Sequence, residues 1–177
     1  WVDYNGHVHE SRYLQLFADA TDALLGELGV DADYLAAVAS YFTVETHLSH
    51  LRQLEAGDRV HVTTQVLDSD EKRLHVFHVL LCEGEDDPVA TAEQMLLHVS
   101  AETGRVFPAA PTVASRIAEI GDAHSAIEPP RQAGRLAAGR DPGGAGGAAE
   151  KLPWPLWKVA RSVPSTTPNR WMTSARL

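Results

Sequence analysis

The 177-residue chain has little of what marks secreted or membrane proteins. Its single cysteine, Cys82, excludes an intrachain disulfide and suits a reducing compartment. No apolar run approaches the roughly 20 residues of a membrane-spanning helix, and the opening residues show no signal-peptide pattern. We therefore expect a cytoplasmic protein without a membrane partner.

Basic residues are also scarce in the first two thirds of the chain. Residues 1–121 carry 20 acidic and 7 basic side chains, whereas residues 122–177 carry 4 and 8, and the whole chain has a net charge of −9. Nucleic acids require a basic surface, so no nucleic-acid partner is expected. An acidic body tolerates or favours a cationic ligand.

The apolar pattern first predicts one long helix. Residues 1–9 read as a polar loop, and from Glu10 to Leu28 apolar side chains recur at spacings of three and four, with Gly29 at a typical stop. Apolar residues off that stripe indicate a well-buried helix. Residues 30–41 are a linking stretch that has room for a second short helix.

The period then changes to two, which is typical of strands. Polar turns separate four such runs, at residues 42–48, 60–66, 74–82 and 89–99. One long helix followed by an antiparallel meander is an α+β pattern, and a sheet wrapped around the helix is the simplest packing. Because the chain opens on Trp1, a further strand is expected before it.

The character of the chain changes near residue 121. We expect a folded domain over 1–121 and a Gly/Pro/Ala-rich basic tail over 122–177 that is disordered.

The segment Asp3-Tyr4-Asn5-Gly6-His7 directly precedes the long helix. A carboxylate there lies beside the positive end of the helix dipole. Asp, Asn and Gly are also ordinary turn residues, so spacing alone favours a simple helix-entry turn.

A resemblance changes that balance. The run from Trp1 to Val8, followed by Tyr13-Leu14 and Phe17, resembles the hotdog-fold thioesterases related to 4-hydroxybenzoyl-CoA thioesterase. The likeness continues to about residue 115 and is closest to the betainyl-CoA thioesterases of carnitine catabolism. Its later parts include Phe42-Thr43-Val44-Glu45, Leu51-Arg52, Gly57-Asp58, Lys72-Arg73-Leu74-His75, Ala90-Thr91-Ala92-Glu93 and Met95-Leu96-Leu97-His98-Val99.

The resemblance implies a hotdog fold and hydrolysis of a short acyl-CoA thioester. Asp3 falls on the catalytic carboxylate, as nucleophile or as general base, and Gly6 on the glycine that lets the loop turn tightly. Backbone amides of about His9 and Glu10 would polarise the thioester carbonyl. The family commonly has Asn where this chain has His9.

Other residues are implied as substrate contacts. Asn5, His7 and Tyr13 match the motif and would orient the loop or substrate. Glu45 is either a solvated strand residue or a contact for a cationic acyl group, with aromatic faces from Tyr41, Phe42 and Phe77. Arg52, Lys72 and Arg73 would meet the CoA phosphates or are surface charges beside turns.

No metal and no cofactor are expected. The nine histidines include two pairs three apart on strands, His47 with His50 and His75 with His78, and each pair points to opposite faces. The sequence suggests no third ligand for His7 and His9. Cys82 lies within a strand run, and the chain has no Gly-x-Ser-x-Gly motif, so a Ser or Cys nucleophile is not favoured.

Two rival functions remain. A hotdog hydratase or dehydratase would carry His five residues after the Asp, whereas here Val8 holds that position. A non-catalytic acyl-CoA-binding domain is the other alternative. The family resemblance further implies a homodimer or homotetramer, and fusion or association with carnitine dehydrogenase.

Overall fold

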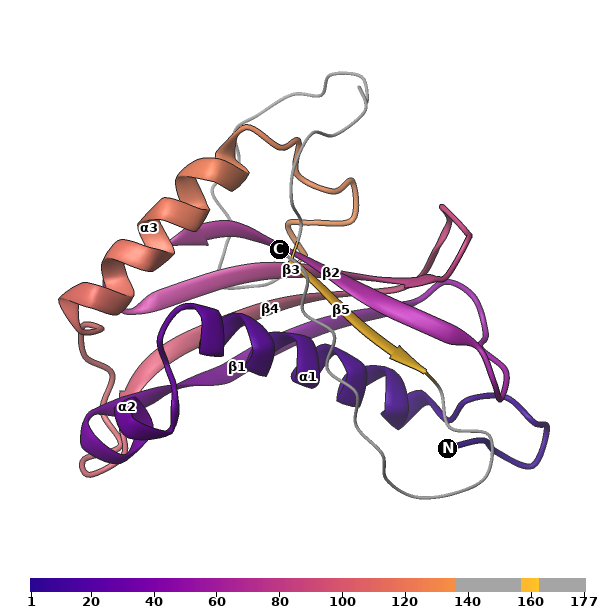
Figure 1. Cartoon of the computed structure of the whole chain (residues 1–177), viewed down its shortest axis with the longest axis horizontal. Coiled ribbons are helices and arrows are strands. Elements are labelled where there is room, and N and C mark those ends of the chain that lie inside the picture. Colours follow the sequence, from indigo (N-terminus) through magenta and orange to yellow (C-terminus); the bar gives the residue numbers. More distant parts are fainter. Residues whose placement is uncertain (136–156, 163–177) are drawn as a thin grey trace.

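The structure is a computed structural model that describes residues 1–135 and the backbone of residues 157–162. The strands are β1 (Ala39–His50), β2 (Arg59–Ser69), β3 (Arg73–Cys82), β4 (Pro88–Ser100) and β5 (Trp157–Ser162), and the helices are α1 (Glu10–Glu27), α2 (Ala32–Ala37) and α3 (Pro111–Ser125). The strands form one antiparallel sheet in the order β1-β4-β3-β2-β5. Figure 1 shows α1 lying across one face of this sheet. This is the hotdog arrangement, so the predicted α+β fold class is confirmed.

Helix α1 forms where the sequence predicts it. Its buried side chains, among them Phe17, Ala20 and Leu24, recur at helical spacing and face the sheet. The helix ends at Glu27, and two residues further on Gly29 has a φ of 88°, in the left-handed region, where the Val30 amide donates to the Leu25 carbonyl at 2.9 Å. The short helix expected within residues 30–41 is α2.

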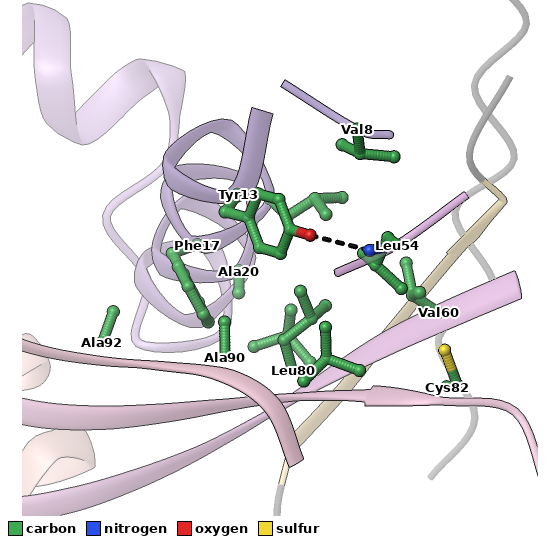
Figure 2. Packing of buried hydrophobic residues seen from close by; sticks show 13 residues of the cluster. Val8, Tyr13, Phe17, Ala20, Leu54, Val60, Leu80, Cys82, Ala90 and Ala92 are labelled. Atoms are coloured by element: carbon green, nitrogen blue, oxygen red, sulfur yellow. Dashed lines mark hydrogen bonds between the residues drawn. The ribbon is translucent and has the colours of Figure 1, made fainter. Parts of the chain in front are cut away.

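The core has two parts. The first packs the beginning of α1 against strands β2, β3 and β4 (Figure 2). Ala90 and Ala92 on β4 are fully buried there, and their small side chains leave room for Phe17. The second part lies at the other end of α1, where α3 inserts Val113 and Ile117.

The predicted strand ranges are confirmed, but the meander is wrong. Strand β1 pairs with β4, from Ala39 opposite Ser100 to His50 opposite Ala90, so β3 and β4 separate β1 from β2. Segment 51–58 therefore crosses the end of the sheet instead of forming a hairpin. Consecutive strands pair or neighbour only about two thirds of the time, so sequence order alone does not decide the pairing.

The described chain continues past the boundary expected at residue 121, which falls inside α3. The Gln65 side chain donates to the Ile127 carbonyl at 3.1 Å, and the Gly134 amide donates to the Glu93 carboxylate at 2.9 Å. Residues 122–135 thus pack with the folded domain, and β5 pairs with β2. The rest of the expected tail, 136–156 and 163–177, lies outside the described residues. Across the described part of the chain, no helix combines the length and the apolar character needed to cross a membrane.

Candidate active site

The loop that precedes α1 is a small hairpin. Val2 pairs with Val8, the Asp3 amide donates to the His7 carbonyl at 2.8 Å, and the Gly6 amide donates to the Asp3 carbonyl at 3.1 Å. Gly6 has a φ of 84°, and a Cβ atom there would have no neighbour within 4 Å. The turn therefore needs glycine for its backbone conformation and not for space.

The Asp3 carboxylate is half-buried and held inside this turn. Its Oδ1 atom accepts the Asn5 amide at 2.8 Å and the His7 amide at 3.1 Å. Burial alone would raise the pKa of this carboxyl, but the two amide hydrogen bonds and the nearby His7 and His9 rings outweigh burial and lower the pKa. Asp3 is thus a fixed, ionised carboxylate whose Oδ2 atom has no hydrogen bond within residues 1–135.

At the start of α1 most amides are already used. The His9 amide donates to the Trp1 carbonyl at 2.9 Å, and the Ser11 amide donates to His9 Nδ1 at 3.4 Å. Of the two amides that sequence analysis assigned to the thioester carbonyl, only that of Glu10 is left without an acceptor among the described residues. The helix dipole points its positive end at the same place.

Tyr13 ties this end of α1 to the segment that crosses the sheet end. The Leu54 amide donates to the Tyr13 hydroxyl at 2.9 Å (Figure 2). The hydroxyl in turn donates to the Arg52 carbonyl at 3.4 Å. The Val8 amide also donates to the Leu54 carbonyl at 2.8 Å. Because Tyr13 is buried, it positions the Arg52–Leu54 segment beside the Asp3 hairpin.

The two arginines predicted to contact CoA lie at opposite ends of the sheet. Arg52 lies at the Asp3 end, where its guanidinium pairs with Glu85 at 2.5 Å. Arg73 begins β3, whose last residue, Cys82, faces Arg52. Nine residues of strand separate these two ends by about 30 Å. Within one chain, Arg73 therefore does not share a site with Asp3.

Glu45 and the expected aromatic residues are also spread out. Glu45 lies on β1 five residues before His50, about 16 Å along the strand from the Asp3 end. Tyr41 is buried against His98, at 5.0 Å between ring centroids. Phe77 is buried beneath residues 127–130, so only Phe42, which is 50% exposed, presents an open aromatic face.

Two features at the Asp3 end were not anticipated from the sequence. The Arg12 guanidinium lies over the Trp1 ring, 5.3 Å from its centroid, and His50 meets Tyr13 edge-on at 4.7 Å between centroids. Arg12 carried a signal, because a cation in the first turn of a helix opposes the dipole and is not placed there for helix stability.

The structure favours neither a metal site nor a cysteine nucleophile in the described part of the chain. Within residues 1–135 no three His, Cys, Asp or Glu side chains come together as a potential metal site. Burial raises the pKa of the Cys82 thiol although Arg52 acts in the opposite direction. A nucleophilic cysteine requires a lowered pKa, so Cys82 is a structural residue.

The fold is a hotdog domain with a half-buried carboxylate just before its central helix. Residues 1–117 match the thioesterase-like superfamily, and the chain belongs to that family.

Similar proteins agree with this assignment. The chain is 48% identical over 135 residues to the L-carnitine dehydrogenase/betainyl-CoA thioesterase of Rhizobium meliloti (strain 1021), covering 76% of this chain and 27% of that protein. It is 43% identical over 137 residues to the betainyl-CoA thioesterase of Pseudomonas aeruginosa (strain PAO1), covering 77% of this chain and 86% of that protein. A Staphylococcus aureus structure in complex with CoA has a TM-score of 0.71 at 28% identity, covering 76% of this chain and 85% of that one. The chain thus spans about a quarter of the length of the relatives whose names give both activities.

Proposed function

We propose that this protein hydrolyses short acyl-CoA thioesters, betainyl-CoA first among them, with Asp3 as the reacting carboxylate. The observation that carries the proposal is the Asp3 hairpin: a half-buried carboxylate whose pKa is lowered, fixed through one oxygen and open at the other. The family match and the names of the relatives support the reaction and the acyl group.

Hydrolysis of the thioester needs a carboxylate, which the hairpin supplies, and a site for the oxyanion, which the start of α1 supplies. Asp3 Oδ2 either attacks the thioester carbon or removes a proton from an attacking water. In both routes the carbonyl oxygen gains negative charge, which the Glu10 amide and the α1 dipole stabilise. The C–S bond then breaks, the sulfur receives a proton, and water supplies the oxygen of the free acid.

A cationic acyl group suits the charge at this end of the sheet. The loop that follows β3 carries Glu83, Glu85, Asp86 and Asp87, and Glu55 bridges to the Asp3 hairpin. Such a field favours a trimethylammonium group over a neutral or anionic acyl group. Glu45 can join this site if a second copy of the chain brings it there.

A second copy is part of the proposal because β1 is an open edge of the sheet. It is 12 residues long, and its exposed side chains include Phe42 and Val44, at 50% and 54% exposure. A long apolar edge of this kind is prone to pair with another strand. We therefore propose that the protein is a homodimer or homotetramer and that it acts in the cytoplasm. We also propose that it associates with an L-carnitine dehydrogenase, because relatives carry both names.

The test is release of free thiol from a panel of acyl-CoAs, with the chain compared with Asp3→Asn and a control, Asp33→Asn, on the exposed helix α2. Asp3→Asn should lower kcat/KM by roughly 100-fold or more, and Asp33→Asn should match the parent. An active Asp3→Asn protein would remove Asp3 from the mechanism. Equal turnover of betainyl-CoA and neutral short acyl-CoAs would remove the cationic preference.

A further inference from the structure

Within residues 1–135, positive charge at the Asp3 end of the sheet comes from three arginines. Arg52 pairs with Glu85 at 2.5 Å, and Arg59 pairs with Glu83 at 2.6 Å. Arg12 has no carboxylate within ion-pair distance among residues 1–135 and lies instead over the Trp1 ring. One of the three guanidinium groups therefore keeps its charge uncompensated in a strongly acidic region.

The backbone places Arg12 close to the reactive hairpin. The His9 amide donates to the Trp1 carbonyl, which fixes the start of the chain against the first turn of α1. Trp1 and Asp3 flank Val2, and alternate residues of an extended segment point to the same side. The hairpin that holds Asp3 thus also begins with Trp1, the residue that Arg12 contacts.

Arg12 is half-buried, and its guanidinium carbon lies 5.3 Å from the centroid of the Trp1 ring. A guanidinium over an aromatic ring offers its face to the ring and keeps its in-plane N–H donors for a ligand. Phosphate oxygens match that fork of donors well. The substrate class of the proposed function carries phosphates on its CoA portion, whereas the surrounding carboxylates repel such groups.

We propose that Arg12, positioned by Trp1, binds a phosphate of the CoA portion of the substrate. The proposal rests on the proposed function and deepens it. The hairpin then carries the reacting carboxylate and the Trp1 ring that holds Arg12, whereas Arg52 and Arg59 are paired with carboxylates of the loop after β3.

The first experiment measures binding without catalysis. Titration calorimetry compares free CoA with pantetheine, which lacks the phosphates, on the full chain and on Arg12→Gln, Arg12→Lys and Arg59→Gln. Arg12→Gln should raise the Kd of CoA roughly tenfold, Arg12→Lys should fall between that variant and the parent, and pantetheine binding should not change. Arg59→Gln is the matched control and should bind CoA as the parent does.

Three results would overturn the proposal. Unchanged CoA binding by Arg12→Gln would remove Arg12 from the site. An equal loss for CoA and pantetheine would mean that Arg12 shapes the hairpin and does not meet a phosphate. An equal loss in Arg59→Gln would reduce the effect to general surface charge.

Kinetics separate this inference from the proposed function. With acyl-CoA, Arg12→Gln should raise KM and leave kcat near the parent value, and with the matching acyl-pantetheine both constants should stay unchanged. If the parent releases no thiol but its CoA affinity depends on Arg12, the phosphate site stands and hydrolysis fails. If the parent is active and Arg12→Gln has the parent's KM, hydrolysis stands and the phosphate site fails.

Discussion

Acid should destabilise this fold through one histidine beneath α1. His78 is fully buried, with Thr64 Oγ1 at 2.8 Å from Nδ1, and with Thr21 Oγ1 at 3.1 Å and Gln94 Oε1 at 3.3 Å from Nε2. The amide oxygen of Gln94 can only accept, so Nε2 carries the proton and Nδ1 accepts from the Thr64 hydroxyl. A neutral imidazole satisfies every one of these groups, whereas a second proton would face the Thr64 hydroxyl, and no charged side chain among residues 1–135 bonds to the ring.

The magnitude follows from the pKa. Burial lowers the pKa of His78 from 6.5 to about 4, although the hydrogen bond to Gln94 acts in the opposite direction. Below pH 6.5 the unfolded chain takes up a proton at this position and the folded chain does not. Stability is therefore complete above pH 6.5 and falls as the pH drops toward 4, by about 3 kcal/mol in total.

Urea unfolding at pH 7 and pH 4.5 measures this difference. His78→Gln keeps an acceptor and a donor in the cavity but cannot be protonated, and His78→Asn is a second variant in case the first does not fold. Between the two pH values the parent should lose about 2–3 kcal/mol more than either variant. His47→Gln, on the partly exposed β1 strand, should lose as much as the parent. The argument is refuted if His78→Gln and the parent lose the same free energy, because carboxylates common to both would then account for the whole acid response.

Two paired substitutions test other parts of the structure by thermal unfolding. The Tyr34 hydroxyl bonds to His98 Nε2 at 2.9 Å and accepts the Ala110 amide at 3.1 Å, whereas the buried Tyr41 hydroxyl has no partner in the described residues. Tyr34→Phe should therefore cost about 1–2 kcal/mol and Tyr41→Phe should be neutral or stabilising, and a larger loss for Tyr41→Phe would contradict this account. Gly6→Ala should cost about 1 kcal/mol and also slow thiol release, because its φ is positive. Gly26→Ala, within α1 and with no neighbour near the added carbon, should instead stabilise by about 0.5–1 kcal/mol.

The sequence predicted the local elements of the fold well and their pairing poorly. Helix α1 was placed to within one residue at its end, because its spacing and Gly29 are local signals. The partner of β1 depends on contacts 40 to 61 residues away along the chain, between His50 and Ala90 or Ala39 and Ser100, which no local pattern encodes. Helix α3 was missed although Pro111 stands at its first turn, because few of its side chains are buried.

In the candidate site, too, the local motif was predicted from the sequence, whereas the contacts between distant residues were not. The position of Asp3 and Gly6 follows from a contiguous motif and its family resemblance, and the structure places both in one tight turn. The use of the His9 amide by the Trp1 carbonyl is a tertiary contact that the sequence does not reveal. Arg73 was grouped with Arg52 because both are rare cations, but the direction of β3 puts them at opposite ends of the sheet.

The buried polar residues of β3 and β4 explain how the sheet keeps one register. His75 and His78 were predicted to face opposite sides, and the structure confirms it. His78 meets Gln94 under α1, and His75 bonds Glu93 at 2.8 Å on the other face. The Glu93 carboxylate, only 1% exposed, also accepts an amide from Gly134. A slip of either strand by one residue would exchange its two faces. A slip of β4 would bury the Glu93 carboxylate against α1, where the donors now serve His78, at a cost of several kcal/mol. The pairs His78–Gln94 and His75–Glu93, which lie on opposite faces of the sheet, therefore disfavour a shift of register between β3 and β4. A fixed register also fixes the end of β3, with Cys82 and the loop beside Asp3.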